Sequence, residues 1–315
     1  MDGALLIDKP AGITSFDVLK QVRRMFLDSG VLYKDLPKFG HGGTLDPFAT
    51  GLLIVLIGEA TKLSDMFLGS KKCYEGEIQF GAATLSGDIE TEVSEKTKTP
   101  DSFEMIKSKA KLFSEKPYLQ VPPMYSAKKV NGRRLYKLAR KDRTVERDAV
   151  ECVIENFEVF NYDESTSKFK VICSSGTYIR VLAEDLAKEA GSLGHLLSLR
   201  RLKSGDKKLE ESVTLEVMKD KFKASTLFQS KAFIPLINFL PTSQHIELPE
   251  EYILKVVEGK HEPLKWLSFQ VTEMAPYLSF IYEGRVIAIV ESDEYRWKYK
   301  KVFVKLKDFS EGKLK

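Results

Sequence analysis

A glycine-rich segment at 40–51, GHGGTLDPFATG, constrains the fold of this chain more than any other feature of its sequence. Four of its twelve residues are glycine, a residue that permits tight turns and close approach of other backbone. Pro47 restricts the residue before it, Asp46, to extended conformations. The apolar run Leu52–Ile57 follows directly and is typical of a buried strand. The segment therefore predicts an irregular loop that fixes one carboxylate beside a strand.

The chain up to about residue 240 predicts a mixture of strands and helices. Apolar runs and period-two alternation indicate strands, and apolar residues at helical spacing indicate helices. Thr14 and Ser15 are typical of a helix cap, and Gly191 of a helix end. We expect strands at 4–7, 52–57, 74–80, 150–160 and 168–173, a hairpin at 161–167, and helices at 16–26, 61–68, 102–113 and 179–190.

Beyond Leu240 and Pro241 the pattern changes to short apolar runs. We expect strands at 278–282, 286–290 and 302–306, with a turn at 283–284 between the first two. The sequence thus predicts two units, residues 1–240 and a small β-rich unit at 241–315.

Length and composition exclude several classes of protein. A chain of 315 residues, 43% of them hydrophobic, can bury a core without disulfides. Its three cysteines form no CxxC pair, which favours a reducing compartment. No apolar run approaches the ~18 residues of a membrane span, and the N-terminus lacks the basic region of a signal peptide. We therefore expect a cytoplasmic protein that does not bind membranes.

Positive charge is clustered, although the formal net charge is only +4. The stretch 128–147 contains nine Lys or Arg and two acids, and 195–208 and 296–315 are also basic. A segregated basic face fits a polyanion such as nucleic acid. Three solvated surface stretches explain the same pattern, so charge alone leaves both interpretations open.

Asp46 and His41 carry the ionisable side chains of the glycine-rich segment. A carboxylate fixed in a loop is a candidate reactive group, and capping of backbone amides is the alternative. His41 has no partner at a recognisable metal-ligand spacing, and the other three histidines are isolated. We therefore predict no metal site.

Six segments, in order, resemble one known family. Residues 40–51 resemble the GH(T/G)GTLDP(L/F)ATG signature of the TruB-type transfer-RNA pseudouridine synthases. Three residues depart from the family pattern, at Leu85, Asp142 and Val150, which leaves details of RNA contact open. The other matching segments are Asp8–Ser15, Lys71–Tyr74 (K-x-Y), Gln120–Lys129 (QxPPxYSAxK), Ser175–Arg180 (GTYIR) and Leu199–Leu202 (LRR).

The resemblance implies a fold and a reaction. The fold is α+β, with a mixed, largely antiparallel central sheet flanked by helices and a small β-rich C-terminal domain of the PUA type. The family converts uridine at position 55, in the T loop of tRNA, into pseudouridine. The base is detached at N1, turned and rejoined to the sugar through C5. Because this is an isomerisation, the resemblance implies no cofactor and no metal.

The resemblance also assigns roles to residues of this chain. Asp46 is the reacting carboxylate, and Arg180 is its cationic partner, which is expected to oppose the rise in pKa caused by burial. Tyr74 is the third catalytic residue and stacks on the base. In the substrate-binding set, Tyr178 and Leu199 line the pocket, with Ile179 pointing away; His41 fills the space left by the base; Lys9 and Pro10 support the floor; and Asp88 completes the set.

The first basic cluster overlaps an insertion at about 118–148 that in the family folds over the T loop. The resemblance implies that this insertion binds RNA phosphates. The residues assigned to these contacts are Lys128, Lys129, Arg133, Arg134 and Arg140.

Two other functions remain as alternatives. A non-catalytic tRNA-binding or tRNA-folding protein on the same scaffold needs the basic surface but not Asp46. A carboxylate hydrolase built on His41 and Asp46 needs a second acid that the sequence does not clearly supply. In the principal reading the partner is the T arm of tRNA, with no obligate protein partner. We expect a monomer, because no heptad or extended apolar stripe is visible.

Overall fold

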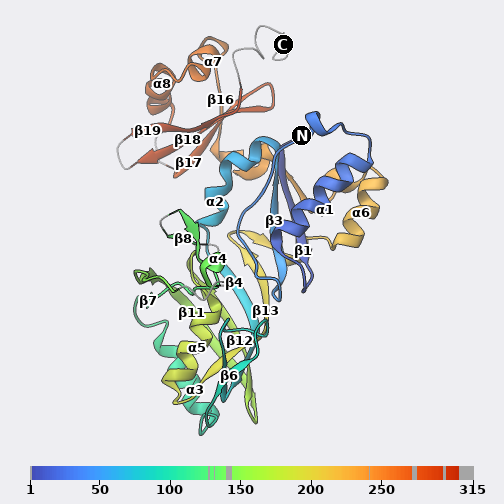
Figure 1. Ribbon diagram of the computed structural model, residues 1–315. Coiled ribbons are helices and arrows are strands. Elements are labelled where there is room, and N and C mark those ends of the chain that lie inside the picture. Colours follow the sequence, from blue (N-terminus) through green and yellow to red (C-terminus); the bar gives the residue numbers. More distant parts are fainter. Residues whose placement is uncertain are drawn as a thin grey trace.

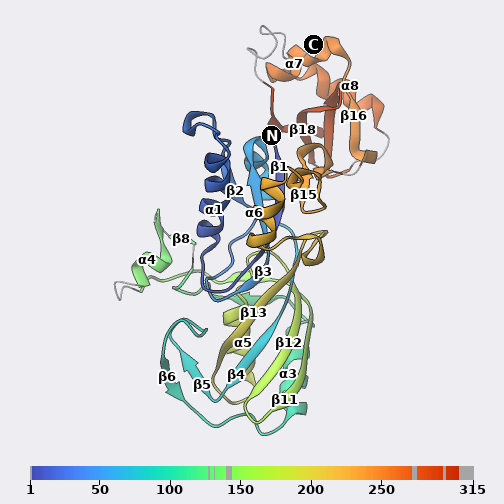
Figure 2. The same ribbon diagram turned by 90° about the vertical axis from the view of Figure 1, so that its right-hand side faces the viewer.

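The computed structural model describes residues 2–126, 128–130, 132–139, 144–240, 242–271, 275–293 and 296–304, without the side chains at 129, 130, 133, 134, 136, 137 and 242. The molecule is elongated, with a large sheet and its helices forming the body and a smaller sheet at one end (Figures 1 and 2).

A nine-stranded sheet forms the body of the molecule. Its strands are β1 (Gly3–Lys9), β2 (Phe39–His41), β3 (Thr50–Ile57), β4 (Lys72–Phe80), β11 (Ile154–Asp163), β12 (Thr166–Cys173), β13 (Gly194–Ser204), β14 (Lys207–Lys208) and β15 (Phe233–Pro235). The order is β11-β12-β4-β13-β3-β1-β15, with β14 beside β13 and β2 beside β3. Strand β13 runs antiparallel to β4 and parallel to β3. The predicted mixed, largely antiparallel sheet is confirmed.

Helices cover one face of this sheet. They are α1 (Ser15–Asp28), α3 (Phe103–Leu112), α5 (Ile179–Glu189) and α6 (Leu215–Lys223). Their buried apolar residues form the main core with alternate residues of β1 and β3. The other residues of these two strands form a second core with Phe67 and Phe239 on the opposite face. Burial on both faces explains why 52–57 is an unbroken apolar run.

Short elements lie around the edges of the body. A 3₁₀ turn at Gly58–Leu63 leads into α2 (Ser64–Leu68). Three two-stranded sheets follow: β5 (Ala82–Thr84) with β6 (Val93–Lys96), β7 (Tyr118–Gln120) with β10 (Val150–Cys152), and β8 (Lys129–Val130) with β9 (Arg133–Arg134). Helix α4 (Leu135–Ala139) follows β9, and β8 and α4 stand away from the central sheet (Figure 2).

The C-terminal unit has its own sheet and its own core. Strands β16 (His245–Glu247), β17 (Tyr277–Tyr282), β18 (Arg285–Asp293) and β19 (Arg296–Val302) are neighbours in that order, with α7 (Glu250–Val257) and α8 (Glu262–Gln270) packed on them. Apolar contacts that include Leu63 and Ile289 join the unit to the body. Lys300 reinforces the junction by pairing with Asp65 of α2 at 3.0 Å. The small strand-rich unit agrees with the predicted PUA-like fold.

Several elements lie where the sequence predicts them. Helix α1 begins after Thr14, whose side chain accepts from the Asp17 amide while the Asp17 carboxylate accepts from the Thr14 amide. Helix α5 ends before Gly191, which adopts a positive φ of 71°. The strands expected at 4–7, 52–57 and 74–80 are present as the inner parts of β1, β3 and β4.

Other expectations were wrong in position or missed an element. The third C-terminal strand lies at Arg296–Val302, so it meets the predicted 302–306 only at Val302; 303 and 304 are not in a strand, and 305–306 lie outside the described residues. The sequence did not indicate this strand because Trp297 and Tyr299 alternate with cations, a pattern that is also typical of a solvated surface. The turn between β11 and β12 is shorter than 161–167. The expected helix at 61–68 begins as a 3₁₀ turn. Strand β13 and helices α6, α7 and α8 were not predicted.

Candidate active site

A cavity of about 260 Å³ lies where β13 passes from β4 to β3. Six segments line it: the loop before β3, the end of α2 at Leu68, the start of β4, the insertion at Ser126, the residues leading into α5, and β13. They bring together residues that the sequence assigned to one site. These residues are Asp46, Tyr74, Tyr178, Arg180 and Leu199.

Contacts on both sides fix the loop that carries Asp46. The Ser15 hydroxyl donates to the Leu45 carbonyl at 3.0 Å, and the Leu45 amide donates to the same hydroxyl at 2.8 Å. On the other side, the buried ammonium of Lys9 donates to the Pro47 carbonyl at 3.2 Å. Burial lowers the pKa of Lys9 to about 8, while the charge of Asp46 opposes this. The backbone is therefore held on either side of the carboxylate.

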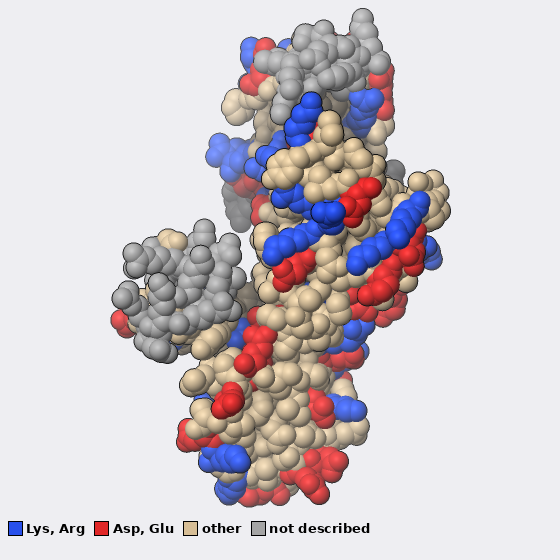
Figure 3. All heavy atoms as spheres, turned by 45° about the vertical axis from the view of Figure 1, so that its right-hand side comes forward, with Lys and Arg blue, Asp and Glu red and all other residues tan. Residues whose placement is uncertain are grey.

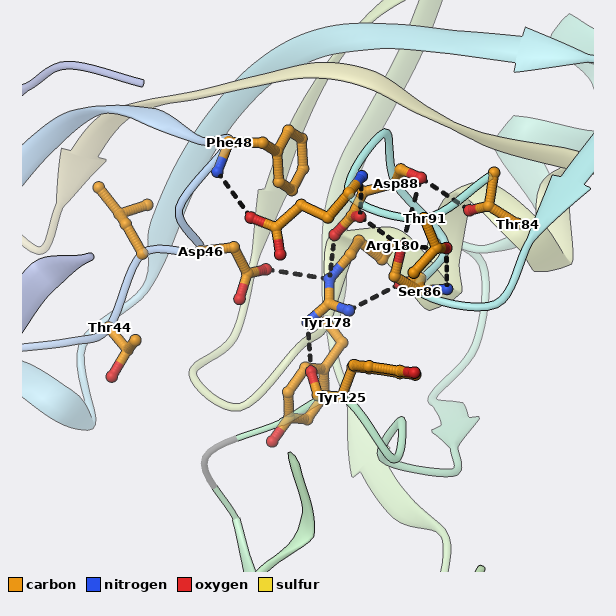
Figure 4. Close-up of polar contacts among 12 residues, drawn as sticks. Thr44, Asp46, Phe48, Thr84, Ser86, Asp88, Thr91, Tyr125, Tyr178 and Arg180 are labelled. Carbon is orange, nitrogen blue, oxygen red and sulfur yellow. Dashed lines mark hydrogen bonds and ion pairs between the residues drawn. The ribbon is translucent and has the colours of Figure 1, made fainter. Parts of the chain in front are cut away.

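Arg180, in the first turn of α5, holds the Asp46 carboxylate directly (Figure 4). Its Nε donates to Oδ2 of Asp46 at 2.9 Å. Its two terminal nitrogens donate to the carbonyls of Ser86 and Tyr125, each at 2.7 Å. A second carboxylate, that of Asp88, has its Oδ2 3.6 Å from Nε. Because each nitrogen has a partner, the guanidinium, with its side chain only 4% exposed, is fixed in orientation.

Burial outweighs the cation in shifting the pKa of Asp46. Loss of hydration raises the pKa of Asp46, Arg180 opposes the rise, and the neighbouring Asp88 adds to it. The Asp46 side chain still lines the cavity and is 34% exposed. The carboxyl group of Asp46 is thus accessible from the cavity, and burial makes its ionisation costly. Both properties are typical of a reactive group.

Asp88 does not line the cavity but lies behind Arg180 (Figure 4). Its carboxylate accepts hydrogen bonds from the Ser86 hydroxyl and the Glu90 amide. Its contacts are therefore with the cation and its own turn. Glu90 in turn accepts from the Phe48 amide at 3.2 Å, which ties this turn to the loop of Asp46.

The aromatic residues of the site come from β4 and α5. Tyr74 is almost fully buried on β4, and burial raises the pKa of its phenol, with the charge of Arg201 acting in the opposite direction. Tyr178 caps α5, and Gln120 holds it by accepting from its amide at 2.7 Å and donating to its carbonyl at 3.0 Å. Leu199 lines the cavity from β13.

Ile179 was expected to point away from the cavity. It is buried in the main core and also lines the cavity beside Tyr178 and Arg180. The expectation assumed strand alternation, whereas a helix begins at this residue.

The remaining assigned residues surround the cavity at greater distance. Lys9 is buried beneath the loop, and Pro10 is exposed, its carbonyl accepting from the Lys9 ammonium at 2.8 Å. His41 lies on β2 and does not line the cavity, and its Nδ1 accepts from the Gly43 amide at 3.4 Å.

The insertion is described only in part. Lys128 is exposed. Lys129, Arg133 and Arg134 lie on the strands of the β8–β9 hairpin, with their side chains outside the described part of the chain. Arg140 lies outside the described residues altogether. Their phosphate contacts stay predictions.

Three further observations bear on the class of site. Among the described residues, no group of three or more His, Cys, Asp or Glu side chains is arranged to hold a metal ion. In the same part of the chain, every helix is too short or too polar to cross a bilayer. The three cysteines are free and buried.

Comparison with known proteins then identifies the family. The sequence model for TruB family pseudouridylate synthases (N-terminal domain) matches residues 31–179. A protein of Clostridium kluyveri named tRNA pseudouridine synthase B is 36% identical over 311 residues, covering 96% of this chain and all of that protein. The chain belongs to the TruB family. It is therefore a pseudouridine synthase, an isomerase.

Other relatives agree with this membership. The tRNA pseudouridine synthase B of Psychrobacter cryohalolentis is 38% identical over 261 residues, covering 82% of this chain and 71% of its own. A chain in the crystal structure of a Cbf5-Nop10-Gar1 complex has the same fold, with a TM-score of 0.66 at 21% identity, over 96% of this chain and 85% of its own. The likeness of fold thus covers nearly the whole of this TruB-family chain, the body and the C-terminal unit included.

The pKa of Asp46 predicts how its replacement changes stability. A carboxyl whose pKa is raised in the folded state destabilises the fold when ionised, and this cost disappears as the pH falls through the folded pKa to the unfolded value. We expect Asp46→Asn to be at least as stable as the wild type at pH 7, with the difference shrinking toward pH 4. Calorimetric melting of both proteins over this range checks it, and an Asn variant that melts lower at pH 7 contradicts it.

Proposed function

We propose that this enzyme isomerises uridine 55 in the T loop of tRNA, and that Asp46 is the reacting carboxylate. The observation that carries the proposal is the Asp46–Arg180 pair at the wall of a cavity that Tyr74, Tyr178 and Leu199 also line. The relatives' names supply the substrate class, because they act on tRNA.

The reaction breaks the bond between N1 and C1′ and forms a bond between C5 and C1′. No electrons are gained or lost overall, and the proton lost from C5 is balanced by one gained at N1. A carboxylate in this cavity has three possible targets: C1′ of the sugar, the base, or the proton at C2′. Each requires Asp46 ionised and close to the sugar–base junction.

Arg180 is the group that keeps an ionised carboxylate in this position. It opposes the burial of Asp46 and the repulsion from Asp88, both of which favour the protonated acid. We assign Asp88 a positioning role, because its carboxylate lies 3.6 Å from Nε of Arg180 and does not line the cavity. Arg180 therefore links the two carboxylates, and only Asp46 reaches the substrate.

The cavity suits one nucleotide rather than a duplex. Its volume lies near the small end of the range for ligand pockets, ~300–1,000 Å³. A base inside it must leave its stack, as in enzymes that act on flipped nucleotides. Stacking of the base on an aromatic ring contributes ~1–3 kcal/mol, which offsets part of the free energy lost when the base leaves its stack. Tyr74 is the ring we assign to this stacking.

We propose that residues 1–240 form the catalytic domain and 241–315 a PUA-like RNA-binding domain. Within the first, the insertion at about 118–148 clamps the T loop through phosphate contacts. On the face shown in Figure 3, Lys and Arg side chains are interspersed with Asp and Glu over the described body, so this face carries no continuous basic path. We expect the phosphates at the insertion, where the described Lys128 is exposed.

An isolated T-arm hairpin tests the reaction and its site together. We expect the wild type to convert one uridine, at position 55, and Asp46→Asn to lose turnover by at least about 10³-fold while still binding the hairpin. Asp206→Asn, at an exposed acid paired with Lys207, is the matched control and should keep full activity. The readout is mapping of pseudouridine after a single turnover.

Each outcome of this experiment is informative. Turnover by Asp46→Asn removes Asp46 from the mechanism. Isomerisation at another uridine contradicts the T-loop assignment. Binding without turnover by the wild type supports the alternative of a tRNA-folding protein.

Salt dependence tests the phosphate contacts of the insertion. Each contact contributes about −0.7 to −0.9 to the slope of log binding constant against log salt. We expect Lys128→Gln to weaken hairpin binding and to reduce this slope by about one contact. Lys98→Gln, at an exposed lysine paired with Asp101, should leave it unchanged. Fluorescence anisotropy with Asp46→Asn as the parent measures binding without turnover, and an unchanged slope in Lys128→Gln contradicts the contact.

A further inference from the structure

Arg201 is a buried cation in the wall of the cavity, with no role assigned so far. It lies on β13 two residues beyond Leu199, and the whole residue is 2% exposed. Its Nε donates to the Leu52 carbonyl at 2.7 Å, and its terminal nitrogens donate to the carbonyls of Gly43 at 3.0 Å and Thr44 at 3.4 Å. Within the described part of the chain, it makes no ion pair with a carboxylate. These three hydrogen bonds go to backbone carbonyls within the segment 43–52, and a side-chain hydrogen bond to Tyr74 adds to them.

That loop is the one that carries Asp46. Gly43 and Thr44 lie before the carboxylate, and Leu52 lies after it, so one guanidinium holds both ends. The planar fork of an arginine reaches several acceptors at fixed angles, which a lysine ammonium does not. Arg201 therefore closes the loop 43–52 into a fixed shape.

The glycines at the two ends fit this arrangement. A Cβ on Gly51 would lie 2.4 Å from the Arg201 carbonyl oxygen and 2.7 Å from its amide nitrogen, and the φ of Gly51 is +100°. A Cβ on Gly43, whose φ is +142°, would lie 3.4 Å from a terminal nitrogen of Arg201. Only a residue without a side chain lets β13 approach Gly51 so closely. The glycines at 43 and 51 therefore allow the loop to pack closely against Arg201.

Arg201 also faces the aromatic side of the cavity. It pairs across the sheet with Tyr74, and both residues line the cavity. Directly opposed residues of an antiparallel pair have Cβ atoms ~5 Å apart. The charge of Arg201 opposes the burial that raises the pKa of Tyr74, while Cys173 and Asp46 act in the same direction as burial. One side chain thus contacts the loop of Asp46 and neighbours Tyr74.

We propose that Arg201 is a positioning residue, which sets the Asp46 loop and Tyr74 at a fixed distance across the cavity. The proposal rests on the function proposed above. It requires that loss of Arg201 slows the chemical step at saturating RNA, because a shift of ~1 Å in a reacting group costs about 10²-fold in rate. RNA affinity should change little, because phosphate contacts supply most of it.

The test compares Arg201→Lys and Arg201→Met with the neighbouring Arg200→Met. Arg200 lies on the same strand but forms a two-point ion pair with Asp8 and does not line the cavity, so it is a matched control. The measurements are the single-turnover rate at saturating T-arm hairpin, the Kd for the hairpin, and the melting temperature of each variant. We expect both Arg201 variants to lose about 10²-fold in rate per folded molecule with Kd within about 3-fold. Arg200→Met should retain the wild-type rate.

The outcomes separate this proposal from the one it rests on. A wild type without turnover overturns the proposed function and this inference with it. An active wild type together with an Arg201→Lys variant within about 3-fold of its rate overturns the positioning role alone. Loss of affinity with an unchanged rate at saturation also overturns it. If Arg201→Met does not fold, Arg201→Lys, which keeps the charge, decides the question.

Discussion

The contact between the Arg180 guanidinium and the Asp46 carboxylate is the interaction on which the site depends. It joins the start of α5 to a loop 134 residues earlier in the chain. Burial and Asp88 both favour a neutral Asp46, so the cation is what opposes them. The guanidinium is itself fixed by carbonyls from two further segments. The position of the carboxylate is therefore a property of the whole body of the molecule.

Buried cations organise the rest of the site through backbone carbonyls. Lys9 donates to the carbonyls of Pro10, Ile13 and Pro47. Lys72, which lines the cavity, donates to those of Phe67, Leu68 and Ser70. Burial lowers the pKa of Lys9 and of Lys72 to about 8 in each case. Cations satisfied by carbonyls hold irregular loops without adding a carboxylate that would compete with Asp46 for Arg180.

Elements with a strong local signal could be predicted from the sequence. Helix α1 has a capping box and apolar residues at helical spacing, and β3 is an unbroken apolar run. Strand β13 was not predicted because Arg200 and Arg201 are typical of an exposed, charged surface. In the structure Arg201 is buried and Arg200 half-buried, and both bind other segments of the chain. Helices α7 and α8 were missed because the tail was interpreted from its strands alone.

The candidate site, like the fold, could be predicted only in part from the sequence. The assigned set around Asp46 does gather at one cavity, because the motifs name residue types that the chemistry needs. Gln120 and Arg201 were not singled out, since their roles arise from carbonyls and amides that only the folded chain brings together. Asp88 was placed with the substrate, whereas its contacts are with Arg180 and its own turn.

The most direct test of this account is the titration of the Asp46 carboxyl itself. Carbon-detected NMR of labelled aspartate, assigned with Asp46→Asn, reports its pKa in the wild type and in Arg180→Met. The account predicts a pKa above the ordinary value of 3.8 in the wild type and a further rise when the guanidinium is removed. A wild-type pKa below 3.8, or the same pKa in both proteins, would contradict it.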